Sequence, residues 1–175
     1  MTSKEEADGY KTRLKTFIES AKFPILREDH QNELWLLTVQ VGPFKTVISY
    51  DPDVPFAIVS IRIGDANDSS HLKTLNKLIQ DPKERTKFMF NMHPILNSTV
   101  TSYTIDMRDD TFYGFVVYKS LFMCDDRFSI RDIDSVFNAV LAIAHAGSIY
   151  VAYKNGEIAP MQTNHNASPF DRMYG

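Results

Sequence analysis

The sequence predicts an α+β fold, in which helices and runs of strands occupy separate parts of the chain. Residues 34–41, 44–50 and 56–63 are rich in β-branched and aromatic side chains, and only short turn segments separate them. Patterns typical of amphipathic helices precede this run, follow it and close the periodic part of the chain. Short links favour antiparallel pairing, so we expect a meander and a hairpin in one sheet, not a doubly wound parallel sheet.

The N-terminal third supplies a helix and then strands. Between residues 4 and 21, apolar side chains recur at intervals of three and four, which predicts an amphipathic helix that ends before Pro24. A weaker strand is expected at 24–28. The sequences Gly-Pro at 42–43 and Asp-Pro-Asp at 51–53 are typical of turns, and they join the three strong strands into the meander.

The middle of the chain predicts a broken helix. Leu72, Leu75 and Ile79 share one helical face. The segment 81–84 then supplies an aspartate as N-cap, a proline at the first helical position and a glutamate at the third, which together favour a new helix start. We expect this second segment to run over 83–92.

A hairpin and a long helix complete the predicted fold. Residues 100–107 and 112–121 read as two strands. The last helix begins at Ser129, and Asp132 three residues later forms a variant of the capping box. The predicted order of elements is therefore α-β-β-β-α-β-β-α, with N-terminal, middle and C-terminal helices around one sheet.

Composition narrows the class of protein. The 175 residues are 43% hydrophobic and 23% charged, which suits one domain, expected over 1–155, with a flexible tail over 156–175. Cys124 is the only cysteine, so an intramolecular disulfide is excluded. The charged N-terminus and the lack of a long uninterrupted apolar run favour a cytoplasmic protein with no membrane segment. A net charge of −3 gives no general attraction to nucleic acid.

His145 is the residue that most invites a catalytic interpretation, because it stands alone in an apolar run. On a helix it falls at the edge of the apolar stripe. A metal site would need a ligand one turn away, but Leu141 and Ile149 occupy those positions. We therefore expect a structural histidine whose ring packs at the edge of the core.

Other chemical motifs are weak. Carboxylates cluster at Asp106, Asp109 and Asp110 and again at Asp125 and Asp126, beside predicted turns where aspartate is favoured for its own backbone hydrogen bonds. The sequence contains no phosphate-binding loop and no histidine pair at metal-ligand spacing. We expect no catalytic residue, no metal and no cofactor.

The strand at 112–121 has two apolar faces. Strict alternation places Phe112, Val116 and Tyr118 on one side, and Tyr113, Phe115, Val117 and Leu121 on the other. One side meets the helices; the other must be covered by the tail, by another subunit or by a protein ligand. Tyr103 on the preceding strand extends the same surface. The candidate protein-binding residues are Tyr103, Phe112, Val116 and Tyr118.

Several segments together resemble a known family. They are the first helix, the strands LWLLTVQV and FAIVSIRI, the helix LNKLIQDPKERTKFMFNM, and the stretch YGFVVYKSLFMCDDRFSIRDIDSVFNAVLAIA. The chain resembles an archaeal domain-of-unknown-function family whose fold is like that of type III secretion chaperones and YbjN-like proteins. The resemblance covers residues 4–153. It implies a compact α+β domain that dimerises and binds an extended protein segment, with no catalytic residues to transfer.

The functional hypothesis is a non-enzymatic, chaperone-like module that binds another protein or a second copy of itself. One alternative is a small-ligand or metal-dependent enzyme, whose site assembles distant residues such as Asp109, Asp125 and His145. A second is nucleic-acid binding through the basic face between Lys73 and Lys87; a solvated helix face is the favoured interpretation of that charge.

Overall fold

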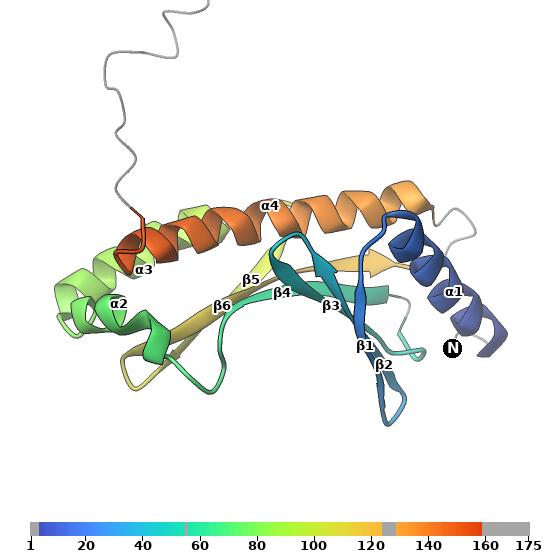
Figure 1. Cartoon of the computed structure of the whole chain (residues 1–175), viewed down its shortest axis with the longest axis horizontal. Helices are drawn as coiled ribbons and strands as arrows, with labels where there is room; N and C mark the ends of the chain where they lie inside the picture. Colours follow the sequence, from blue (N-terminus) through green and yellow to red (C-terminus); the bar gives the residue numbers. More distant parts are fainter. Residues whose placement is uncertain (1–3, 55, 124–128, 159–175) are drawn as a thin grey trace, which may run out of the picture.

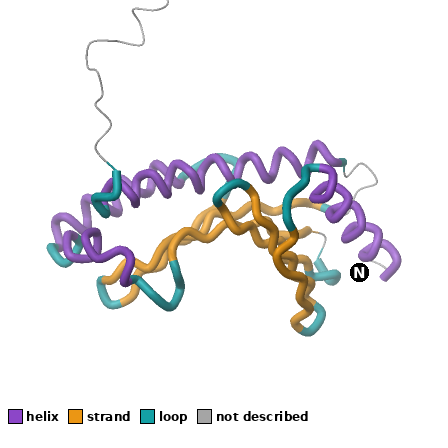
Figure 2. Tube along the Cα trace, in the orientation of Figure 1, coloured by secondary structure: helices purple, strands orange, loops and turns teal. Residues whose placement is uncertain are grey.

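The computed structural model describes residues 4–54, 56–123 and 129–158 and consists of one sheet with helices on one side (Figures 1 and 2). Cys124, Asp125, Asp126 and most of the predicted tail, 159–175, lie outside the described residues. In chain order the elements are α1 (Lys4–Ser20), β1 (Ile25–Gln31), β2 (Leu34–Val41), β3 (Phe44–Tyr50), β4 (Phe56–Gly64), the 3-10 turn η1 (Ser70–Leu72), α2 (Lys73–Leu78), α3 (Pro82–Leu96), β5 (Ser102–Arg108), β6 (Thr111–Phe122) and α4 (Ile130–Lys154).

The six strands form one antiparallel sheet in the order β1-β2-β3-β4-β6-β5. This confirms the predicted α+β class and the combination of meander and hairpin. The weak strand expected at 24–28 is the seven-residue β1, so four strands precede the middle helices. Its sequence ILREDHQ is charged and mostly exposed because β1 is an edge strand, and a register shift between Ile25 and Arg27 interrupts its ladder. Charge and irregularity of this kind discourage pairing with another chain.

Two hydrophobic clusters fill the space between the sheet and the helices. The first joins α1 and the N-terminal half of α4 to β2, β3 and β4, and its largest side chain is Trp35. The second joins α2, α3 and the C-terminal half of α4 to β4 and β6. The strand side chains in both clusters point to the same side of the sheet. We call this side the helix face; it includes Trp35, Leu37, Val39, Ile48, Val59, Ile61, Phe112, Phe115 and Val117.

The long helix α4 spans both clusters. Its start confirms the predicted capping box: Ser129 accepts from the Asp132 amide, and the Asp132 carboxylate accepts from the Ser129 amide at 2.9 Å. Its 25 residues include an 18-residue window with a mean hydropathy of 1.5, so by length and composition alone the helix is long and apolar enough to cross a membrane. In the folded domain one side of it packs on the sheet, through residues from Ile133 to Val151.

The helix α3 begins as predicted and ends later than predicted. The Asp81 carboxylate accepts from the Lys83 amide at 2.7 Å, and Pro82 occupies the first turn. The helix then continues through Pro94 to Leu96 instead of stopping near residue 92. Pro94 lies in the last turn, so the single helical hydrogen bond that it removes is close to the end of the helix, and the fully buried Leu96 anchors that end.

Candidate functional site

The side of the sheet opposite the helices carries apolar side chains that no described helix covers. We call it the open face. Its central apolar residues are only half-buried and belong to neither hydrophobic cluster. They come from four neighbouring strands: Leu36 from β2, Val47 from β3, Ile58 from β4, and Val116 and Tyr118 from β6.

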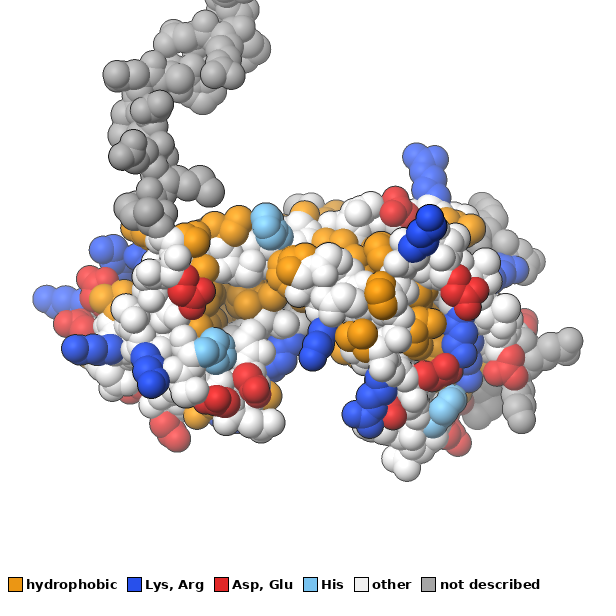
Figure 3. Space-filling view, in the orientation of Figure 1, with side chains coloured by type: hydrophobic (Ala, Val, Ile, Leu, Met, Phe, Trp, Pro, Cys, Tyr) orange, Lys and Arg blue, Asp and Glu red, His pale blue; other side chains and the backbone are white. Residues whose placement is uncertain are grey.

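The open face is concave. The sheet arches below α4, with the open face on the inside of the arch (Figures 1 and 2). In the space-filling view the arch forms a hollow between the β1–β2 hairpin and the end of the domain that holds α2 and the β5–β6 turn (Figure 3). Lys and Arg side chains stand at the margin of this hollow, and Asp and Glu side chains lie on both sides of it (Figure 3). A concave surface with apolar side chains at its centre suits a protein segment better than it suits water.

Two of the predicted binding residues, Val116 and Tyr118, lie on the open face. Val116 pairs with Arg62 of β4 and Thr104 of β5. Tyr118 pairs with Ser60 and Ser102. Directly paired residues share a face, so Val116 and Tyr118 form one surface with these polar neighbours, as the alternation of β6 predicts.

The prediction that Phe112 shares this surface is wrong. Phe112 is fully buried on the helix face, where its ring meets Phe88 edge-on at a centroid distance of 5.2 Å. The cause is a one-residue shift in the hairpin: Asp106 pairs with Gly114 but Met107 pairs with Phe112. Tyr113 is therefore an extra residue in β6, as in a β-bulge, and it turns Phe112 to the other side.

The prediction that Tyr103 extends the open face is also wrong. Tyr103 pairs with Val117, a fully buried residue of the helix face. Its hydroxyl lies 2.5 Å from Nδ1 of His93 on α3, and its ring packs at the edge of the second cluster. Tyr103 thus helps attach α3 to the sheet and does not line the hollow.

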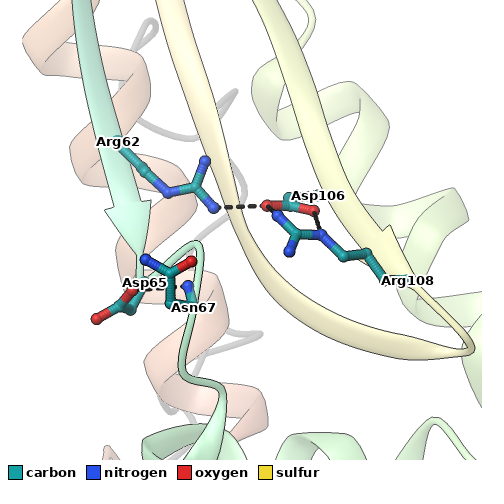
Figure 4. Close-up of polar contacts among 5 residues, drawn as sticks. All are labelled: Arg62, Asp65, Asn67, Asp106 and Arg108. Atoms are coloured by element: carbon teal, nitrogen blue, oxygen red, sulfur yellow. Dashed lines mark hydrogen bonds and ion pairs between the residues drawn. The ribbon is translucent and has the colours of Figure 1, made fainter.

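A charged cluster on the open face was not predicted. Nη2 of Arg62 donates to Oδ2 of Asp106 at 2.6 Å, and Arg108 donates to both Asp106 oxygens at 3.0 and 2.9 Å. Figure 4 shows the Arg62 side chain reaching across the intervening strand to Asp106. Gly114 is the β6 residue opposite Asp106, and its lack of a side chain leaves that path open. The Arg62 guanidinium first, and the Arg108 guanidinium second, lower the pKa of Asp106.

The opposite end of the open face is aromatic. Phe56 of β4 pairs directly with Phe122 of β6, and their rings meet edge-on at a centroid distance of 6.0 Å. Phe122 is 66% exposed, an unusual position for a phenylalanine. The open face therefore has an aromatic end, an apolar centre and a cationic end along β4 and β6.

The remaining candidates of the sequence have structural partners. His145 is exposed on α4, and its ring packs edge-on against Phe44 at 6.3 Å, which agrees with the predicted edge position. Asp109 and Asp110 are the two turn residues between β5 and β6, both with positive φ. No group of three His, Cys, Asp or Glu side chains within the described residues forms a metal-ligand set.

The basic surface between Lys73 and Lys87 is partly neutralised. Arg85 pairs with Asp110 at 2.7 Å, and Lys87 lies 3.9 Å from Glu84. Lys73, Lys77 and Lys83 are exposed. The segment has no aromatic side chain among these lysines, whereas a groove that binds single-stranded nucleic acid uses aromatic side chains to stack the bases.

A groove of about 310 Å³ lies on the helix side, between η1, the start of β6 and the C-terminal part of α4. Ile63, Leu72 and Phe112 line it, together with Glu157. The buried Asn155 holds its wall: Nδ2 donates to the His71 carbonyl at 2.9 Å and to Glu157 at 2.6 Å, and Oδ1 accepts from the Leu75 amide at 3.0 Å. These contacts are structural, and the groove is separate from the open face.

Comparison with known proteins supports the fold and gives no function. No family model matches the chain, and no curated protein matches it. A solved structure, of an uncharacterized protein from Methanothermobacter thermautotrophicus, is similar with a TM-score of 0.66 and 14% sequence identity. The likeness covers 85% of this chain and 97% of that chain. At this identity it shows a shared fold with an archaeal protein and nothing about ligands or partners.

Proposed function

We propose that the chain is a non-enzymatic protein-binding module whose open face binds another polypeptide. One observation carries the proposal: Val47, Ile58, Val116 and Tyr118 form an apolar centre on a sheet face that none of the described helices covers. In antiparallel strands that face water on one side, the residues on the solvated side are normally polar. An apolar and concave open face therefore favours the binding of a partner.

The proposal includes a chaperone-like role. Its support is the resemblance of the sequence to the YbjN-like and type III secretion chaperone fold, together with a single sheet that leaves one face open for an extended segment. The single cysteine, which excludes an intramolecular disulfide, supports a reducing and therefore cytoplasmic location. The partner is a different protein or a second copy of this chain, as in a homodimer.

Site-specific photo-crosslinking in cells tests the proposal. A benzoylphenylalanine replaces Tyr118 on the open face in one variant and Tyr153 in the other. Tyr153 is 40% exposed on α4 and serves as the matched aromatic control on the helix layer. We expect irradiation to join residue 118 to a polypeptide and to leave residue 153 unjoined.

Mass spectrometry of the joined product identifies the partner. A product with the mass of two copies supports a homodimer through the open face, and a product with another protein supports a separate client. Equal joining at both positions, or none at residue 118 in folded protein, contradicts the proposal.

A further inference from the structure

The charges of the open face have the opposite sign to the charge of the whole chain. Strand alternation places six charged side chains on this face: Arg27, Asp29, Lys45, Arg62, Asp106 and Arg108. Four cations and two carboxylates give +2, whereas the chain carries −3. On β1, Arg27 and Asp29 pair with each other at 2.5 Å and their charges cancel. The positive excess therefore lies at the cationic end, with Lys45, Arg62 and Arg108.

That excess is concentrated around one carboxylate. Both Arg62 and Arg108 form ion pairs with the Asp106 carboxylate. Lys45 of β3 lies opposite Arg62 of β4, because the preceding pair in the ladder is Thr46 with Ile61. The Arg62 side chain is 33% exposed, and the Arg108 side chain is 52% exposed above the Tyr113 ring, so neither side chain is buried. In Figure 4 the nearby Asp65 lies on the loop after β4, with its carboxylate turned away from Arg62. Two guanidiniums with donors to spare favour a second carboxylate beside Asp106.

The distance between the two ends of the face sets a spacing. Phe56 and Arg62 are on the same strand and on the same face, six residues apart. A strand rises about 3.3 Å per residue, so roughly 20 Å separate the aromatic end from the cationic end. An extended peptide that lies along β4 and β6 has the same rise per residue. An apolar side chain at one end therefore matches an acidic side chain about six residues away.

We infer that the open face selects an extended polypeptide segment that carries a large apolar side chain and, at this spacing, an aspartate or glutamate. The inference rests on the proposed function and adds the chemistry of the partner. Phe56 and Phe122 contact its large apolar side chain, and Ile58 and Tyr118 lie beneath the residues that follow. Arg62, Arg108 and Lys45 bind its carboxylate. The positive excess selects against basic segments of the same shape.

Fluorescence anisotropy with degenerate peptide pools tests the inference. Each labelled pool carries Phe and Glu at the stated spacing, in both orders, with mixtures of Val, Thr, Ser and Gln between them. Matched pools replace Glu with Gln or with Lys. We expect the Glu pool to bind about tenfold more tightly than the Gln pool, an advantage that falls as salt is raised. The Lys pool should bind more weakly than either.

Two charge variants identify the site. Arg62→Gln removes a cation from the open face and should abolish most of the advantage of the Glu pool over the Gln pool. Lys87→Gln removes a cation from α3, on the helix side, and should leave that advantage unchanged. Circular dichroism of both variants checks that the fold is intact. An advantage that survives Arg62→Gln overturns the inference.

The remaining outcomes separate this inference from the proposed function. If the Glu and Gln pools bind the wild type equally and neither binds the Tyr118→Ser variant, the acidic preference is overturned, while the proposed function of the open face as an apolar binding surface stands. Binding of no pool contradicts both. A labelled oligothymidylate that binds more tightly than the Glu pool, and loses its affinity in Arg62→Gln, also overturns the inference because it makes nucleic acid the partner.

Discussion

The two faces of the sheet are built by the same strands, yet they tolerate change very differently. Val117 of β6 is fully buried beneath the helices, while its neighbour Val116 is half-buried on the open face. On the helix face, side chains from α4 and the sheet fill the space between the layers. On the open face, apolar groups remain where a partner can reach them. An apolar side chain alone therefore does not reveal whether it serves stability or binding.

The largest expected contrast comes from the same substitution at adjacent positions. Val117→Asp places a carboxylate in the core with no cation opposite, because Val117 pairs with Ile61 and Tyr103. We expect a loss of more than about 4 kcal/mol and an unfolded chain. Val116→Asp faces Arg62 and should change the free energy of unfolding by less than about 1 kcal/mol. Thermal unfolding followed by circular dichroism compares them.

That pair also checks the register of β6. Similar melting temperatures for the two variants would mean that both side chains have the same surroundings, contrary to the alternation of the strand. A folded Val116→Asp that no longer crosslinks a partner would connect the open face to binding. An unfolded Val116→Asp would place Val116 in the core of the monomer instead.

A smaller loss is expected from the buried amide of Asn155. Its side chain bonds to the Leu75 amide, the His71 carbonyl and Glu157, and so attaches η1 and α2 to the end of α4. Asn155→Ala leaves the Leu75 N–H without this acceptor, and we expect a loss of about 1–3 kcal/mol in urea denaturation. Ser49→Ala on the open face is the matched control, with a change within about 0.5 kcal/mol. Equal effects would mean that Asn155 is not an internal connection.

A pair of helical glycines measures how closely the helix face is packed. A Cβ on Gly147 of α4 would lie 2.5 Å from the Phe115 ring and 2.8 Å from Leu96. We expect Gly147→Ala to lose about 1–2 kcal/mol, because the overpacking exceeds the gain in helix propensity. Gly9 of α1 has no neighbour within 4 Å of the same position, so Gly9→Ala should gain about 0.5–1 kcal/mol. Opposite shifts in the urea midpoint would confirm the difference; a stabilising Gly147→Ala would refute it.

The contrast between local sequence signals and pairing between distant strands also explains which features the sequence predicts correctly. The bounds of β2 and β3 and the starts of α3 and α4 follow from local signals, namely turn residues, alternation and caps. Phe112 was misplaced because the bulge at Tyr113 leaves no mark in the alternating pattern. Arg62 and Asp106 are 44 residues apart, and their meeting depends on the pairing of β4, β6 and β5, which no local signal determines. The alternation of FAIVSIRI is a local signal from which Phe56, Ile58 and Arg62 could have been placed on one face.

The smallest expected effect is the titration of Asp106. Because Arg62 and Arg108 lower the pKa of this carboxyl below its ordinary 3.8, the ion pairs stabilise the fold at pH values above 3.8. That contribution is lost as the pH falls through the lower pKa of the folded state. The ¹³C shift of the Asp106 carboxyl, followed against pH, should report a midpoint below 3.8 in the wild type.

Arg62→Gln removes the largest cause of this shift, so the midpoint should rise toward 3.8 while the melting temperature at neutral pH changes little. The Lys87→Gln control should leave the midpoint where it is. A midpoint that does not move in Arg62→Gln would mean that Arg108 alone holds the carboxylate. Arg62 would then be available to any anion that reaches the open face, and the hollow would be more strongly cationic than the ion pairs indicate.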